Sequence, residues 1–173
     1  MKRLFFGLEP GYETRQQCTT IMQAIDSPDN QPVPAANLHV TLVFLGLVDA
    51  AQQSALLEEA AMIPGAKLTI TFNQLEYWQK PGILCLTASD ASAELLMLAD
   101  SLTAMAKKLA IPVDERPYLA HVTLARKAKH PVELAFEPVI WQADMFCLFE
   151  SVSSENGVEY RVIKRWAMES RAG

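Results

Sequence analysis

Two of the three histidines in this chain begin the same tetrapeptide, His-Val-Thr-Leu, at residues 39–42 and again at residues 121–124. With ordinary residue frequencies, the chance that a second histidine is followed by the same three residues is roughly one in a thousand. Imidazole titrates near neutral pH, so one histidine can act as a general base and the other as a general acid. Threonine hydroxyls can donate hydrogen bonds to the non-bridging oxygens of a phosphodiester. The repeat therefore indicates acid–base chemistry on a phosphodiester, which requires neither a metal nor a covalent intermediate.

Strand geometry explains why the spacing within each motif matters. Successive side chains of a strand alternate between its faces, so His39 and Thr41 share a face and lie roughly 6.6 Å apart along it. His121 and Thr123 are related in the same way. A lone histidine in an apolar strand is more often a core residue, and threonine is common in strands, but the repetition of both favours function. We predict that His39 and His121 are catalytic and that Thr41 and Thr123 bind phosphate.

Three further side chains near the second motif need an interpretation. Arg126 could bind two phosphate oxygens at once. Strict alternation places it on the face opposite His121 and Thr123, so only a bend or bulge at the strand end would bring it into the site. Tyr118 is a candidate for stacking on a nucleobase, with core packing as the alternative. His130, in a basic loop, is expected to be solvated.

The elements that must position these residues follow from periodicity and turn residues. Helices are expected at residues 11–26, from the candidate N-cap Asp49 to about residue 62, and at 91–110. Strands are expected at 2–8, 38–45 (ending at Gly46 and buried on both faces), 67–78, 83–87, 118–125, 144–151 and 159–168. Hairpin turns are expected at 80–82 and at Asn156-Gly157. The order implies two similar halves, hence an α+β fold with pseudo-twofold lobes, mainly antiparallel sheets and outer helices, and with both motifs facing a central cleft.

Composition bounds the class of protein. The chain has 173 residues, half of them apolar, which suits one bilobed domain over residues 1–173 and excludes full disorder. A net charge of −5 lacks the basic character of proteins that grip long nucleic acids, so short partners are expected. The excess of acidic residues is concentrated before residue 111, which leaves a locally positive cleft open in the second half.

The sequence argues against a membrane span, a signal peptide and several kinds of binding site. No apolar run approaches the length of a membrane span, and the N-terminal segment becomes polar before a signal-peptide core develops, so a cytoplasmic protein is expected. Cys18, Cys85 and Cys147 are odd in number and widely spaced, which argues for buried thiols rather than disulfides or a closed zinc site. Dinucleotide, P-loop, nucleophile-elbow and zinc motifs do not occur, and no cofactor or metal is expected.

The two motifs resemble those of the two-histidine (2H) phosphoesterase superfamily, whose hallmark is a pair of separated His-x-Thr/Ser-x motifs. Here the two histidines are 82 residues apart (121 − 39). The chain is most similar to the branch of LigT-like RNA 2′,3′-cyclic phosphodiesterases. The matching segments, in the family's order, are residues 3–6, 37–46, 121–126 and 160–166. Ala120 stands where the family usually has a proline before the second histidine.

The resemblance implies two lobes flanking a cleft and a cofactor-independent hydrolysis of RNA 2′,3′-cyclic phosphate ends. It assigns His39 as the proton donor and His121 as the proton acceptor, with the 3′-oxygen leaving so that a 2′-phosphate remains. The reverse reaction with a 5′-hydroxyl would join RNA ends through a 2′–5′ linkage. The expected partners are RNA ends or small cyclic nucleotides, and the expected state is a monomer.

Two alternative hypotheses for the function stay open. One is another 2H activity, such as opening ADP-ribose 1″,2″-cyclic phosphate or trimming RNA 3′ ends. The other is a non-catalytic module that binds RNA or nucleotides. The presence of both histidines and both threonines argues against a pure binder, because binding does not need two proton-transfer groups.

Overall fold

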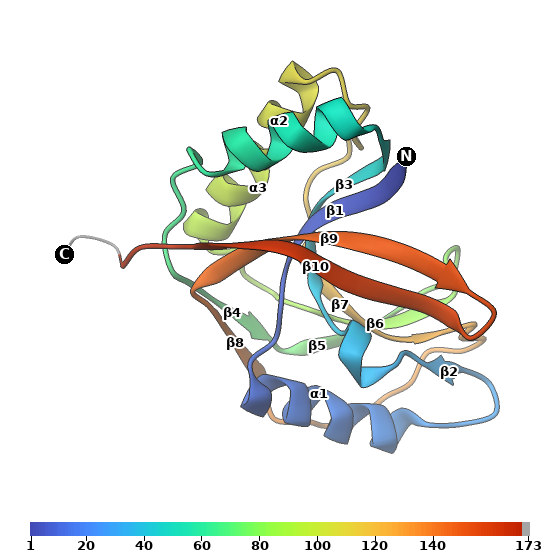
Figure 1. The fold of residues 1–173 in the computed structure, drawn as a ribbon. Coiled ribbons are helices and arrows are strands. Elements are labelled where there is room, and N and C mark those ends of the chain that lie inside the picture. Colours follow the sequence, from blue (N-terminus) through green and yellow to red (C-terminus); the bar gives the residue numbers. More distant parts are fainter. Residues whose placement is uncertain (171–173) are drawn as a thin grey trace.

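Two four-stranded antiparallel sheets, each containing one of the repeated motifs, form the framework of the computed structural model, which describes residues 1–170 (Figure 1). The strands are β1 (Lys2–Leu8), β2 (Gln31–Pro32), β3 (Val40–Val48), β4 (Leu68–Phe72), β5 (Gln74–Trp78), β6 (Ile83–Thr87), β7 (His121–Arg126), β8 (Val139–Ala143), β9 (Met145–Ser154) and β10 (Gly157–Ala167). The helices are α1 (Tyr12–Ile25), α2 (Ala50–Ala60) and α3 (Ala93–Lys108), with a 3-10 turn, η1 (Ala35–Asn37). The sheets have the strand orders β10-β9-β1-β3 and β2-β7-β6-β5, and β4 pairs separately with β8.

The expected repetition of the two halves is present in the topology. In the first half, β1 and β3 pair antiparallel and are connected through α1; in the second half, β6 and β7 pair antiparallel and are connected through α3. A further strand extends each pair, β9 beside β1 and β5 beside β6. The α+β class and the mainly antiparallel sheets predicted from the sequence are therefore confirmed.

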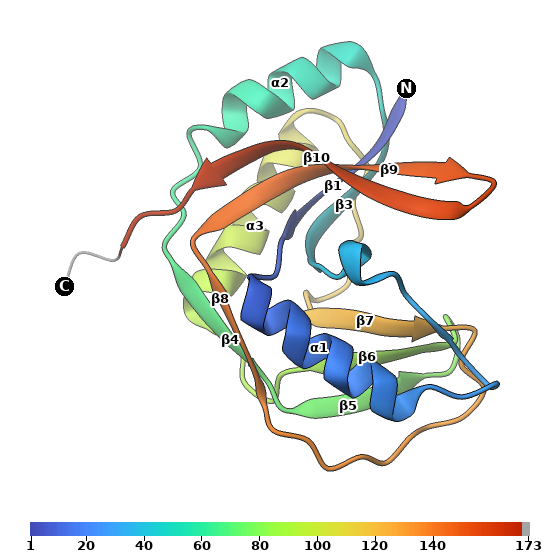
Figure 2. The ribbon, with the colours of Figure 1, turned by 60° about the horizontal axis from the view of Figure 1, so that its bottom comes forward.

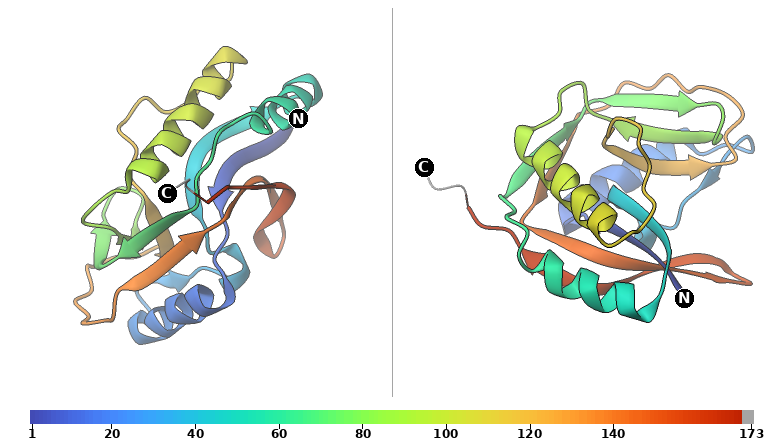
Figure 3. Two further views of the ribbon diagram at one scale, coloured as in Figure 1. Left: turned by 90° about the vertical axis from the view of Figure 1, so that its left-hand side faces the viewer. Right: turned by 90° about the horizontal axis from the view of Figure 1, so that it is seen from above.

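The two halves exchange their helices. α1 contacts β7 and β8, whereas α3 contacts β3 and α2, so each of these helices packs on the motif strand of the other half (Figure 2). α2 and α3 consequently lie together on the side of the molecule opposite α1 (Figure 3). One cluster of buried apolar residues runs through both sheets and these helices. Separating the lobes would expose this shared core, so the cleft between them has fixed walls.

Local signals placed the helices well. The side chain of Asp49 accepts a hydrogen bond from the Gln52 backbone, and the Gln52 side chain accepts one from the backbone of Asp49, which completes a capping box. In α3, Ser92 caps the N-terminus and an apolar stripe at helical spacing is buried. That stripe consists of Leu95, Leu98, Leu102 and Met105.

Two strand predictions were wrong. Residues 67–78 form two strands, because Asn73 leaves the sheet and exchanges side-chain hydrogen bonds with Ser89. β4 then pairs with β8, a strand that was not predicted, while the β5–β6 hairpin is confirmed. The first motif strand does not end at Gly46 and is not buried on both faces. Gly46, with φ +69°, sits at an irregularity where Leu45 has no partner in β1, and the strand continues to Val48 with the side chains of Phe44 and Leu47 exposed.

Smaller differences concern the second motif and the loop before the first. The second motif strand begins at His121 rather than at Tyr118. β2 and η1, which lie between α1 and the first motif, were not predicted. In the described part of the chain, no helix is long and apolar enough to cross a membrane.

Cys18, Cys85 and Cys147 are free and buried as predicted, and burial raises the pKa of each thiol to about 12.

Gly7 in β1 is required by close backbone packing next to the first motif strand. A Cβ added there would lie 2.7 Å from the carbonyl oxygen of Val40 and 3.2 Å from the ring of Phe149. We expect Gly7→Ala to lower the free energy of unfolding by about 1–3 kcal/mol, the usual range for overpacking. Gly11→Ala is the matched control, since no heavy atom lies within 4 Å of its added Cβ. Equal free energies of unfolding for the two variants, measured by urea unfolding, would contradict this prediction.

Candidate active site

The two motif strands lie close together across the boundary between the sheets. β3 contacts β7, and the hydroxyl of Tyr118 donates a hydrogen bond to the carbonyl of Thr41 over 2.9 Å. The segment leading into the second motif is thereby attached to the first motif. The Tyr118 side chain is half-buried, and burial raises the pKa of its hydroxyl. This contact gives Tyr118 a positioning role, and stacking on a base stays a prediction.

Both histidines are held in the same way by the backbone. Nδ1 of His39 lies 2.7 Å from the carbonyl oxygen of Asn37, and Nδ1 of His121 lies 3.2 Å from that of Leu119. A carbonyl oxygen only accepts hydrogen bonds, so Nδ1 carries the proton in each neutral ring and Nε2 has the free lone pair. Nε2 of His39 accepts a hydrogen bond from the hydroxyl of Thr41 at 3.0 Å. The reactive nitrogen of each ring is therefore set by a carbonyl two residues earlier.

Aromatic side chains fix the planes of the two imidazoles. The ring centroid of His39 lies 4.9 Å from that of Phe5 and 4.9 Å from that of Tyr160, which stands edge-on to it. His121 lies 4.6 Å from the ring of Trp78. Phe5 is almost fully buried together with Phe149. The rings are thus packed on apolar surfaces, and Nε2 of His39 stays in contact with the hydroxyl of Thr41.

Burial makes both imidazoles hard to protonate in the free protein. Desolvation lowers the pKa of His39 to about 4, against the hydrogen bond to Asn37, and the charges of His121 and Arg126 lower it further. Desolvation and Arg126 also lower the pKa of His121. These mutual effects place the two motifs and Arg126 within electrostatic reach of one another. An anion bound between them would favour protonation of the histidines, because it would offset the charge of Arg126.

Arg126 reaches the cleft through a bulge in β7. Thr123 is opposite Cys85 and Ala125 is opposite Leu84, so Leu124 has no partner in β6. Leu124 and Ala125 are both buried, which breaks the alternation of faces and returns Arg126 to the side of Thr123. One guanidinium nitrogen of Arg126 lies 3.4 Å from the hydroxyl of Tyr160. The bulge that the sequence analysis required is present.

The motif residues line two hollows. The smaller hollow, of about 250 Å³, is lined by His39, Thr123, Arg126 and Tyr160 among others. The larger hollow, of about 670 Å³, is lined by Thr41, Trp78, Tyr118 and His121 among others. Each hollow combines the histidine of one motif with the threonine of the other. A phosphodiester held between the motifs would therefore be contacted from both lobes.

Two residues of the site were missed as functional residues. The side-chain amide of Asn37 donates to the carbonyl of Val158 at 2.7 Å, and its oxygen accepts from the backbone of Tyr160 at 3.4 Å. Tyr160 contacts both His39 and Arg126. Both residues lie in segments that match the 2H family, which was the available signal. His130 is exposed as predicted, and its Nε2 lies 3.9 Å from a carboxylate oxygen of Asp29.

Comparison with known proteins shows the family of this chain. A sequence model of the 2′-5′ RNA ligase superfamily matches residues 13–152. The chain belongs to this superfamily. It is 30% identical over 170 residues to an RNA 2′,3′-cyclic phosphodiesterase of Escherichia coli strain K12, covering 96% of this chain and 97% of that protein.

Solved structures of the 2′-5′ RNA ligase superfamily fold extend the comparison. Escherichia coli LigT complexed with 3′-AMP superposes with a TM-score of 0.89 at 30% identity, over 96% of this chain and 98% of that one. A crystal structure of a phosphoesterase superposes with a TM-score of 0.90 at 28% identity, over 98% of this chain and all of that one. LigT has also been solved with phosphate. The fold predicted from the sequence is confirmed by these similarities.

The low pKa of His39 predicts a pH dependence of stability. The unfolded histidine has a pKa near 6.5, and the folded pKa is about 4. The unfolded chain therefore takes up a proton that the native protein does not, and stability is lost as the pH falls from about 6.5 to 4. We expect the free energy of unfolding of the wild type to fall more steeply over this interval than that of His39→Gln, by up to about 1.4 kcal/mol per pH unit.

Urea unfolding at several pH values, followed by tryptophan fluorescence, measures this difference. His130→Gln is the control. Because His130 is exposed, its removal should leave the pH dependence of the free energy of unfolding as it is in the wild type. Parallel pH dependences for the wild type and His39→Gln would show that His39 is not buried in its neutral form.

Proposed function

We propose that this chain hydrolyses the 2′,3′-cyclic phosphate at RNA ends to a 2′-phosphomonoester by metal-independent acid–base catalysis. The observation that carries the proposal is the pairing of two imidazoles, each held through Nδ1 with Nε2 available, around hollows shared between the two motifs. Membership of the 2′-5′ RNA ligase superfamily and similarity along nearly the whole chain to an RNA 2′,3′-cyclic phosphodiesterase support it.

In the forward reaction, His121 accepts a proton from a water molecule as that water attacks phosphorus. The bond between phosphorus and the 3′-oxygen breaks, and His39 donates its Nε2 proton to the departing oxygen. His39 is neutral in the free protein, so the phosphate anion must raise its proton affinity on binding. Each proton-transfer group contributes roughly 10²- to 10⁴-fold to the rate.

The phosphate itself is held by neutral and cationic donors. Thr41 and Thr123 can donate hydroxyl hydrogen bonds to the non-bridging oxygens, and Arg126 can bind two of them as charge develops. No cofactor takes part. With a 5′-hydroxyl in place of water, the reverse reaction would form a 2′–5′ linkage through the same transition state.

The proposal places this activity in one bilobed domain over residues 1–173, working as a monomer in the cytoplasm. Support for a single working unit comes from the two motifs and the buried core, which one chain supplies. The free, buried cysteines suit a reducing compartment. RNA ends and small cyclic nucleotides are the partners.

The decisive test is hydrolysis of an RNA oligonucleotide with a 2′,3′-cyclic phosphate end, in EDTA and from pH 5 to 9. Wild type should turn over with a bell-shaped pH profile and leave a 2′-phosphate. His39→Ala and His121→Ala should each lose about 10²- to 10⁴-fold in kcat. His130→Ala, which removes an exposed histidine, should retain the wild-type rate.

Other outcomes would point to the alternatives. Activity that disappears in EDTA would contradict metal-independent catalysis. Binding of the oligonucleotide by all variants without turnover would support a binding module. Faster opening of ADP-ribose 1″,2″-cyclic phosphate than of the RNA end would support a different 2H activity.

Asn37 offers a test of how His39 is positioned. Asn37→Ala removes the side-chain hydrogen bonds to β10 and loosens the carbonyl that orients His39. We expect kcat to fall about ten- to a hundredfold with little change in KM, because a small displacement of a catalytic group is enough for such a loss. Asn73→Ala, which removes two side-chain hydrogen bonds to Ser89, should leave kcat unchanged. Equal effects of the two variants on kcat would contradict a positioning role.

A further inference from the structure

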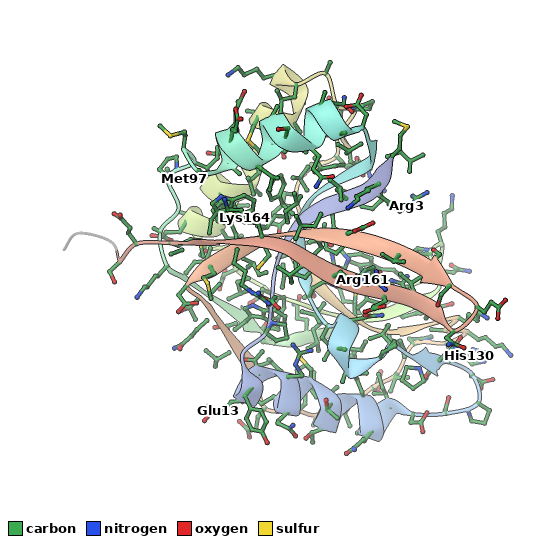
Figure 4. The ribbon with its side chains drawn as sticks, viewed as in Figure 1. Arg3, Glu13, Met97, His130, Arg161 and Lys164 are labelled. Atoms are coloured by element: carbon green, nitrogen blue, oxygen red, sulfur yellow. The ribbon has the colours of Figure 1, made fainter. Side chains whose placement is uncertain are left out.

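The two ends of the cleft differ in charge. At the Arg126 end, the loop after β7 lies beside the β5–β6 turn, since the backbone of Ala128 donates to the carbonyl of Gly82 at 2.9 Å. This arrangement gathers four permanent cations, here named the basic end: Lys80, Arg126, Lys127 and Lys129. Figure 1 shows the ends of β7, β2 and the β9–β10 hairpin on this same side, where Figure 4 labels His130 in the same view.

Of the four cations of the basic end, Lys129 alone has a carboxylate partner within residues 1–170. Lys129 and His130 both face Asp29, at 3.8 and 3.9 Å, and Glu159 on β10 is paired with Arg161. Lys80 and Lys127 are exposed, and within residues 1–170 neither forms an ion pair. The basic end therefore offers two unpaired lysines beside Arg126.

The opposite end of the cleft has no such excess. Along the rim of the larger hollow, Lys107 is paired with Glu115 at 3.0 Å and Arg116 with Asp114. Asp100 adds a further negative charge there. A phosphate chain would gain little at this end, because each cation already has a carboxylate partner.

The loop that carries Lys127 is held firmly in place. Lys127 has φ +51°, a left-handed conformation that costs an L-residue roughly 1–2 kcal/mol. The hydrogen bond from Ala128 to Gly82 and that from the Tyr77 hydroxyl to the carbonyl of Ala128 stabilise the turn. The chain thus turns sharply after Arg126, directly at the rim of the smaller hollow, where β2 pairs with Arg126 through Gln31.

The size of the smaller hollow limits what can lie inside it. Its volume of about 250 Å³ is slightly below the usual range for ligand pockets, so it suits a terminal nucleotide rather than an oligonucleotide. A 2′,3′-cyclic phosphate occupies both of these ribose oxygens, which leaves only the 5′-oxygen to connect the rest of the RNA. The preceding nucleotides must therefore cross the rim, and their phosphates are attracted to unpaired cations.

Resting on the function proposed above, we propose that the basic end binds the phosphates that lie 5′ to the cyclic phosphate. The protein then acts on the ends of RNA chains in preference to cyclic mononucleotides. Lys80 and Lys127 determine this preference without touching the reacting atoms. The acidic character of the remaining surface restricts the contact to a few phosphates next to the end.

The test compares two substrates, 2′,3′-cyclic AMP and a single-stranded tetranucleotide ending in the same cyclic nucleotide. Wild type should have the higher kcat/KM on the tetranucleotide, falling with rising salt. The double variant Lys80→Ser/Lys127→Ser should lose about tenfold on the tetranucleotide, and its slope against log salt should fall by about 1.4, at about 0.7 for each phosphate contact. Hydrolysis of the mononucleotide should change less than about twofold, since it lacks those phosphates. Lys107→Ser/Arg116→Ser, at the opposite end, is the matched control and should behave as wild type.

Each contrary result has a distinct meaning. Equal losses on both substrates would show that the lysines act on the centre or the fold, and would overturn the inference. A selective loss in Lys107→Ser/Arg116→Ser would show that RNA leaves by the other end. Equal kcat/KM of the wild type on both substrates would contradict this inference alone, whereas no hydrolysis of either would contradict the proposed function itself.

Discussion

The cleft depends above all on one hydrogen bond that is made twice: from Nδ1 of a motif histidine to the carbonyl two residues earlier. It fixes the tautomer, so the nitrogen left for chemistry is Nε2 in both rings. His39 makes it from a position just before β3, two residues after η1, whereas His121 makes it as the first residue of β7. Asn37, whose carbonyl accepts this hydrogen bond from His39, is in turn attached to β10 through its side chain. The orientation of both imidazoles is thus set by backbone carbonyls and, for His39, by the contacts of Asn37 with β10.

Burial sets the protonation of this pair, and a shared core sets its rigidity. The aromatic surfaces that orient the imidazoles also exclude water and lower the pKa of both. Two uncharged rings beside a permanent cation form a site that is completed by an anion. The exchange of α1 and α3 between the halves ties the cleft walls to the protein's main core, so this desolvated arrangement does not rely on closure of the lobes. Stability and function therefore draw on the same contacts.

Positive charge is distributed unevenly over the protein. The chain as a whole is acidic, and seven of the fourteen Lys and Arg residues within residues 1–170 are paired with carboxylates. Unpaired positive charge gathers beside Arg126, where the loop after β7 meets the β5–β6 turn. The net charge argues against a protein that binds long nucleic acids, but it could not show where a few phosphates would be bound. That information lies in which side chains the fold brings together.

The amino-acid sequence by itself determined the parts that depend on neighbouring residues. The repeated motif predicts both histidines and both threonines as site residues. A capping residue predicted the start of α2, and turn residues predicted the two hairpins. The need for a bulge before Arg126 also followed from the alternation of strand faces. Tertiary structure alone decided the β4–β8 pair, the exchange of helices, and the roles of Asn37 and Tyr160. Asn37 contacts Val158, 121 positions further along the chain. Such contacts arise from packing the whole core, and no periodicity or spacing within a segment encodes them.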